Sequence, residues 1–143
     1  MATPILGITE MTEGQDGKYV TFNEAMAILD AQAVYMIGMT FIGIPIENEE
    51  MIRHPAAVTF NLPISLTNSQ FKAGTAATAE TIFTLKKNGA AIGTITFAIG
   101  GTSGSIAFTA ATAFAVGDIL TCVAPAVRDA SIANLGFTIK GTR

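Results

Sequence analysis

The sequence predicts a mainly β protein, in which an antiparallel β-sandwich of the jelly-roll kind follows an extended N-terminal arm and one short α-helix. The first observation is the stretch from Thr81 to Ile99, where apolar and polar residues alternate on both sides of Asn88-Gly89. Alternation with a period of two is typical of strands that bury one face. The second observation is that similar short runs recur between residues 57 and 140, separated by turn-rich pieces. Several short strands at this spacing favour a sandwich.

The composition fits one domain with a short N-terminal attachment. Of the 143 residues, 50% are hydrophobic and only 13% are charged, whereas about a quarter is usual for soluble domains. This deficit suggests that other subunits cover part of the surface. We expect residues 1–36 to form an arm and helix for attachment or oligomerisation, and residues 37–143 to form the sandwich.

The net charge of −3 is too mild to indicate a nucleic-acid partner, but its distribution is uneven. Residues 1–50 contain eight acidic residues and one basic residue, whereas residues 51–143 contain three acidic and seven basic ones. Two interpretations stay open. The charges are a chance split of solvated side chains, or the acidic N-terminal and basic C-terminal regions of neighbouring chains attract each other.

No targeting or membrane segment is apparent. The N-terminus lacks the pattern of a secretory signal, and the apolar run from Ala31 to Ile46 is interrupted by two glycines and a proline. That run is also shorter than the ~20 residues of a spanning helix. We therefore expect synthesis in a cytoplasm and no membrane insertion. The single cysteine, Cys122, lies in an apolar run and is expected in the core.

Residues 1–20 are predicted to form an extended arm, and the apolar residues in it need a partner surface. A helix is predicted from Phe22 to about Tyr35, because Thr21 and Glu24 match a capping box and good helix formers follow. The helix is apolar over much of its circumference, so we expect it to pack against the sandwich and against its own copies, or against a docking partner. The residues predicted to serve oligomerisation or attachment are Ile5, Leu6, Phe22, Met26 and Leu29.

The strands are predicted in chain order from the alternating runs. They are Val34–Ile46, Val58–Leu62, the two strands of the hairpin around Asn88-Gly89, Ser105–Thr109, Asp118–Ala124 and Asn134–Lys140. Asn-Gly supplies the two positive φ angles of a type I′ turn. In this hairpin the side chains expected to share one face of each strand are Phe83, Leu85, Ile95, Phe97 and Ile99. Lys72–Thr75 and Gly100–Gly104 are predicted as turns.

No catalytic, metal or cofactor site is predicted. The four residues Glu47–Glu50 lack the pattern of a cation-binding loop. The glycine-rich stretch Gly100–Gly104 lacks the GK[ST] ending of a phosphate loop and precedes a strand. His54 is the only histidine, so a surface or internally bonded imidazole is the simpler interpretation. An enzyme needs a convergent set of acid, base or nucleophile, and we expect none here.

Two segments carry a resemblance to known proteins. The segment LGITEMTEGQDGKYVTFNEAMAILDA resembles a recurring start of bacteriophage tail fibres, in which a turn leads into a "VTxNEAxxxLDA" helix. The matching residues are Val20, Thr21, Asn23, Glu24, Ala25, Leu29, Asp30 and Ala31. The rest of the chain is similar to a module of tail-fibre and receptor-binding proteins. Its elements here are AGTAATAETIFTLKKNGAAIGTITFAIGGTSG, FAVGDILTCVAP and DASIANLGFTIKGTR.

The resemblance implies a virion structural protein of the tail, commonly a homotrimer, whose N-terminal part attaches to other tail or baseplate proteins. It implies host attachment by a receptor-binding or adaptor protein through multivalent, non-catalytic contacts. The alternative is a capsid decoration or head-spike protein without a receptor role. The candidate contact loops are Asn68–Thr75, Gly100–Gly104 and Val127–Ser131, since loops on a rigid scaffold often carry binding. Within them, Asn68, Gln70, Arg128 and Asp129 could hydrogen-bond a host-surface glycan, or be ordinary solvated loop residues.

Overall fold

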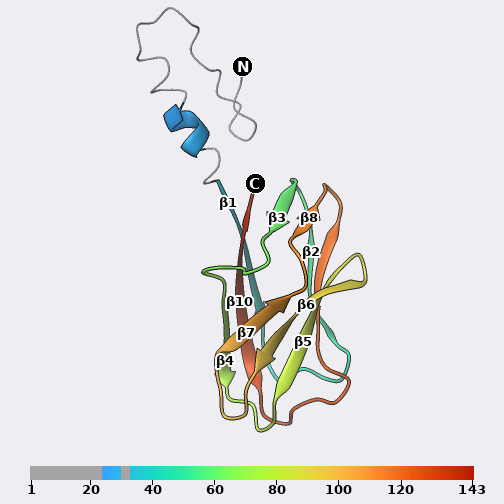
Figure 1. Cartoon of the computed structure of the whole chain (residues 1–143). Coiled ribbons are helices and arrows are strands. Elements are labelled where there is room, and N and C mark those ends of the chain that lie inside the picture. Colours follow the sequence, from blue (N-terminus) through green and yellow to red (C-terminus); the bar gives the residue numbers. More distant parts are fainter. Residues whose placement is uncertain (1–23, 30–32) are drawn as a thin grey trace, which may run out of the picture.

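The computed structural model describes residues 24–29 and 33–143. It contains a short helix at residues 24–29 and two antiparallel sheets of five strands each, as a β-sandwich requires (Figure 1). The strands are β1 Val34–Phe41, β2 Glu50–Pro55, β3 Phe60–Leu62, β4 Gln70–Thr75, β5 Thr81–Lys87, β6 Ala90–Phe97, β7 Gly104–Phe108, β8 Thr112–Phe114, β9 Ile119–Val123 and β10 Ala133–Thr142. The predicted mainly β, antiparallel fold is confirmed.

The first sheet is built around β10, the longest strand. One edge of β10 pairs with the whole of β1, from Val34 opposite Thr142 to Phe41 opposite Leu135. The other edge pairs with β4 and, at Thr142, with β3, which in turn pairs with β8. The N-terminal end of β1 therefore lies beside the C-terminus of the chain, as Figure 1 shows.

The second sheet has the strand order β2-β9-β5-β6-β7. Backbone hydrogen bonding also links the two sheets along one side, because the amide of Ala73 in β4 donates to the carbonyl of Thr102, just before β7, at 2.9 Å. Two β-bulges interrupt the second sheet, one between Glu50 and Ile52 and one beside Leu85 and Lys86.

The core lies between the inner faces of the two sheets and is rich in phenylalanine. Its largest fully buried side chains are Phe60, Phe83, Phe97, Phe114, Phe137, Leu62, Leu85, Ile95, Leu120, Ile132, Leu135 and Ile139. Phe83 packs edge-to-face against Phe97 and Phe137, with ring centroids 5.8 and 6.1 Å apart, and thereby joins the two sheets. Cys122 is fully buried, as predicted.

The hairpin predicted at Asn88-Gly89 is confirmed. The two residues have φ of 48° and 87° and connect β5 to β6. Asn88 has a further function that the turn pattern does not reveal: its Oδ1 accepts from the Ile119 amide and its Nδ2 donates to Asp118, both at 2.8 Å. The predicted orientation of Ile99 is wrong, because β6 ends at Phe97 and the Ile99 side chain is 73% exposed.

Replacing Gly89 with alanine should lower the free energy of unfolding by about 1 kcal/mol, because a Cβ is strained at positive φ. The matched control is Gly136→Ala, where φ is not positive and the added Cβ meets no atom within 4 Å. That control should change stability by no more than about 0.5 kcal/mol. Urea denaturation of the two variants makes the comparison, and equal midpoints would contradict the turn assignment.

Several predicted boundaries are corrected. Tyr35 belongs to β1 and not to the predicted helix, and β1 ends at Phe41 and not at Ile46. Pairing with β10 along the whole of β1 outweighs local helix propensity here. Since β1 begins at Val34, residues 34–36 lie in the sheet and not in the N-terminal attachment. The helix start, with Thr21 and Phe22, lies outside the described residues.

Three strands of the structure, β2, β4 and β8, were not predicted from the sequence. The predicted turn Lys72–Thr75 is the greater part of β4, whose central residues pair with β10. β2 ends in a proline at the edge of its sheet, and β8 has only 3 residues. Such strands are too short or too polar to show a clear period of two, and they form because a neighbouring strand supplies the hydrogen bonds. The predicted run from Val58 is a strand only from Phe60 to Leu62.

Candidate functional site

Two of the three predicted contact loops lie at one end of the sandwich. β10 runs from Ala133 at that end to Thr142 at the other, where β1 begins. The Val127–Ser131 loop precedes Ala133, and the Gly100–Gly104 loop is joined to it through residues 76–79. The Gly100 amide donates to the Ala77 carbonyl, and Asp129 binds Thr78. We call this the distal end, because it is opposite the point where the N-terminal segment enters β1.

Asp129 holds the distal loops together. It is only 6% exposed. Its Oδ2 accepts hydrogen bonds from the Thr78 amide, the Thr78 hydroxyl and the Ala79 amide at 2.7–2.8 Å. Its Oδ1 accepts from the Ser131 amide and hydroxyl and from the Ile132 amide at 2.8–2.9 Å. With six donors already bound inside the protein, this carboxylate serves the fold, and we no longer place it among the ligand contacts.

Two carboxylates have pKa values well below the usual range. For Asp129, burial acts to raise the pKa, but the hydrogen bonds from Thr78, Ile132 and Ser131 outweigh burial and lower it. For Asp118, the hydrogen bond from Asn88, followed by those from Ala115 and Lys87, lowers the pKa to about 2. The Lys87 ammonium lies 3.0 Å from the Asp118 carboxylate. Both groups therefore favour the folded state only while they are ionised.

Acid should weaken the fold accordingly. The unfolded carboxyl groups bind protons near pH 4, and the folded ones only at lower pH, so the unfolded state takes up more protons as the pH falls from about 5 towards 2. The free energy of unfolding should be constant above about pH 5 and decrease below it. Urea denaturation at a series of pH values checks this. In Asp129→Asn the decrease should be shallower, and an unchanged slope would contradict the assignment.

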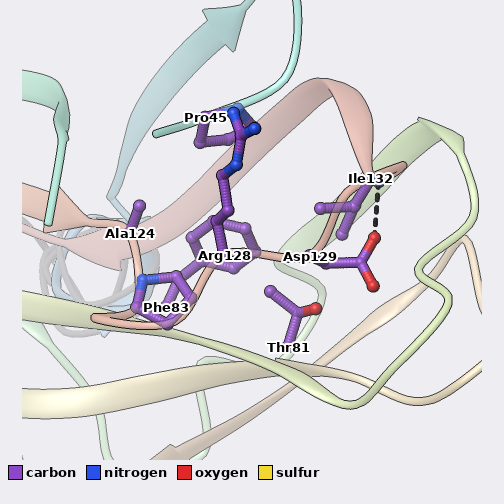
Figure 2. A pocket seen from close by; sticks show the side chains of 8 residues that line it. Pro45, Thr81, Phe83, Ala124, Arg128, Asp129 and Ile132 are labelled. Carbon is purple, nitrogen blue, oxygen red and sulfur yellow. Dashed lines mark hydrogen bonds between the residues drawn. The ribbon is translucent and has the colours of Figure 1, made fainter. Parts of the chain in front are cut away.

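Arg128 lies in the same loop as Asp129 but faces another environment. Figure 2 shows its side chain extended towards Pro45, while Asp129 points away, to the Ile132 amide. Arg128 lies 3.9 Å from the Glu47 carboxylate, and both side chains are about half exposed. The hollow beneath Arg128, lined also by Phe83 and Ala124, has no room for a water molecule. Arg128 is therefore available at the surface, but it does not line a ligand pocket.

The other two predicted glycan contacts lie elsewhere. Asn68 is exposed, with φ of 65°, in the turn before β4, and the exposed Gln70 begins β4 opposite Thr138. Since β4 runs six residues from Gln70 towards Ala133, Gln70 and the Val127–Ser131 loop are separated by roughly 20 Å of strand. The structure does not bring Asn68 and Gln70 together with Arg128.

The predicted oligomerisation residues are described only in part. Ile5, Leu6 and Phe22 lie outside the described residues. In the helix at residues 24–29, Met26 is half-buried and Leu29 is 51% exposed. The described part of this chain therefore leaves much of Leu29 exposed, and the burial of this helix against further copies or a docking partner stays a prediction.

In the described residues, the structure gives the surroundings of the single histidine and the single cysteine. The Tyr35 hydroxyl and His54 Nε2 are hydrogen-bonded at 2.9 Å. Burial raises the pKa of the Cys122 thiol to about 12, so this thiol stays protonated. Within residues 24–29 and 33–143, no three His, Cys, Asp or Glu side chains gather as metal ligands would. None of the helices described there has the length and apolar character needed to cross a membrane.

A cleft of about 380 Å³ on the outer face of the second sheet was missed by the sequence analysis. It is lined by Glu50, Arg53, Lys86, Asn88, Gly89, Ile119, Thr121 and Val123. Alternation could have placed each charged residue on the wet face of its strand. The pairing of β2 and β5 with opposite edges of β9, which brings them together, has no local signal.

The chain matches no protein-family model and no curated protein.

Proposed function

We propose that the protein is a bacteriophage virion structural protein of the tail, either a tail-fibre or tail-tip receptor-binding protein or an adaptor. Its role is host attachment through multivalent, non-catalytic contacts. The resemblance of its motifs to tail-fibre proteins is the origin of this proposal. A structural observation supports it as well. The N-terminal segment enters β1 at one end of the sandwich, and the distal loops lie at the opposite end.

The distal end has the surface of a contact region. Several large apolar side chains are exposed in its loops, and single-chain soluble proteins rarely concentrate such residues without a partner. They are Ile42, Ile44, Ile46, Ile99 and Val127, exposed by 43–85%. A rigid sandwich would present these loops away from the particle, and several copies would gain avidity from their high effective concentration.

Assembly as a homotrimer belongs to the same proposal and rests on the resemblance. The exposed helical side chains Ile28 and Leu29, 57% and 51% exposed, are consistent with burial between copies. Multi-angle light scattering of the full chain at micromolar concentration should give three times the chain mass of 14.8 kDa. A clean monomer mass would contradict the trimer.

Antibody labelling of intact particles in the electron microscope tests the location. Label at the tail tip is expected. Label spread over the head would refute the tail assignment in favour of a capsid decoration or head-spike protein.

Binding of the purified protein to host cells tests the distal end itself. Val127→Asp should reduce binding at least severalfold, because it places a charge in the exposed apolar surface. The matched control is Ile64→Asp, since Ile64 is 55% exposed but lies between β3 and β4. Equal loss in both variants, or in neither, would remove the distal end from the proposal.

A further inference from the structure

The cleft on the outer face of the second sheet contains an ordered row of polar residues. Thr121 in β9 pairs with Arg53 of β2 on one side and with Lys86 of β5 on the other. Directly paired residues in antiparallel strands point to the same face. The neighbours of Thr121 along β9, Leu120 and Cys122, are fully buried in the core, so this row faces outward.

The row places two cations around a hydroxyl group. With strands about 4.8 Å apart, the Cα atoms of Arg53 and Lys86 are separated by about 10 Å, so that both long side chains can converge above Thr121. Thr121 is only 6% exposed and forms part of the cleft lining. A guanidinium, an ammonium and a hydroxyl are all hydrogen-bond donors, and together they suit an oxyanion.

One acidic residue also lines the cleft, and its charge is already compensated. Glu50 Oε1 accepts a hydrogen bond from Arg53 Nη1 at 2.8 Å. A guanidinium has five N–H donors, so the others remain for a ligand. With Glu50 balanced by Arg53, the charge of Lys86 gives the cleft a net positive charge.

Two further features fit a binding site. The β-bulges of the second sheet lie on either side of the row, at Glu50–Ile52 and beside Leu85–Lys86. Bulges are enriched next to functional sites, where they redirect side chains. The volume of about 380 Å³ lies at the lower end of the range of roughly 300–1,000 Å³ for small-molecule sites.

We propose that the cleft formed by Arg53, Thr121 and Lys86 binds the oxyanion of an acidic sugar. The identification of the ligand as a sugar rests on the proposed role in host attachment, whereas the preference for an oxyanion rests on the cleft alone. The Arg53 guanidinium and the Lys86 ammonium bind the carboxylate or phosphate oxygens, and the Thr121 hydroxyl donates a further hydrogen bond. The sugar ring lies in the cleft between the side chains of β2 and β5.

Titration of the isotope-labelled full chain, followed by the NMR signals of the backbone amides, tests the proposal. The probes are glucuronate and glucose 6-phosphate, with methyl glucoside as the neutral control. Acidic probes should shift the amides of Arg53, Thr121 and Lys86 with a Kd of about 1–10 mM, the weak range expected for one small anion. Binding should weaken with added salt. Either acidic probe alone would support the oxyanion site and identify its group as carboxylate or phosphate.

Variants locate the contact. Lys86→Gln should raise the Kd about three- to tenfold, the loss typical of one exposed charge-assisted contact. Thr121→Val keeps the shape and should also weaken binding. The matched control is Lys72→Gln, which removes the same charge from β4 in the other sheet and should leave the Kd unchanged. The spectrum of each variant without ligand verifies its fold.

Some outcomes would overturn the proposal. These are equal shifts with methyl glucoside, no shift with either acidic probe, or a Kd that rises equally in Lys72→Gln and Lys86→Gln. The experiments distinguish a failure of the acidic-sugar site from a failure of the proposed tail function. If Lys86→Gln binds host cells as well as the unchanged protein, attachment stands and the acidic-sugar site is wrong. If glucuronate binds in the cleft but antibodies label the head, the oxyanion site stands and the tail function is wrong.

Discussion

Replacing Asp129 with alanine should lower the free energy of unfolding by about 3–4 kcal/mol. The substitution removes six hydrogen bonds and leaves the backbone amides of Thr78, Ala79, Ser131 and Ile132 without their acceptor. A buried donor without a partner costs about 1–3 kcal/mol, although water can reach part of this loop once the carboxylate is gone. Urea denaturation at neutral pH and fixed protein concentration measures the effect.

The matched control is the neighbouring residue. Arg128→Ala removes an exposed side chain whose ion pair with Glu47 is long, at 3.9 Å, and should change stability by no more than about 0.5 kcal/mol. Asp129→Asn should lie near the alanine variant, because an amide NH₂ group would face backbone donors. If Asp129→Ala is no less stable than Arg128→Ala, Asp129 does not hold the distal loops together.

Replacing Phe83 with alanine should cost about 3–5 kcal/mol, the usual range for a buried phenylalanine. Phe83 is fully buried and contacts Phe97 within its own sheet and Phe137 in the opposite sheet. The truncation leaves a cavity where the two sheets meet, and close-packed neighbours fill such a space only partly. Thermal unfolding followed by circular dichroism should show a large fall in the midpoint temperature.

The control for this variant is one residue away on the same strand. Ile82 is 41% exposed on the outer face of β5, and Ile82→Ala should cost less than about 1 kcal/mol. The two substitutions differ in which face of the strand they alter. Comparable losses would mean that the outer face of β5 is covered in the assembled protein, which light scattering of the Ile82→Ala variant would then examine.

The structure narrows the set of residues that remain candidates for contact with a host-surface glycan. Of the predicted glycan contacts, Arg128 lies at the distal end, Asn68 and Gln70 lie away from it, and Asp129 is engaged by internal donors. Two of the eight acidic residues of residues 1–50 have a basic neighbour in the same chain, since Glu47 lies beside Arg128 and Glu50 beside Arg53.

Local sequence patterns are enough to predict the features that depend on near neighbours. The hairpin at Asn88-Gly89 follows from the φ angles that two residues can adopt. The burial of Phe83, Leu85, Phe137 and Ile139 follows from alternation, because a strand exposes successive side chains to opposite faces. The mainly β fold class follows from the repetition of such runs.

The pairing of the strands and the places where polar residues meet become known only from the three-dimensional fold. Asp129 appears in the sequence as one of several polar loop residues, and it is buried because the loop before β10 folds onto residues 78–79. Arg53, Thr121 and Lys86 are far apart in sequence and form one row because β2 and β5 pair with opposite edges of β9. Strand partners are selected by packing and hydrogen bonding across the whole sandwich, and no local window of sequence contains that information.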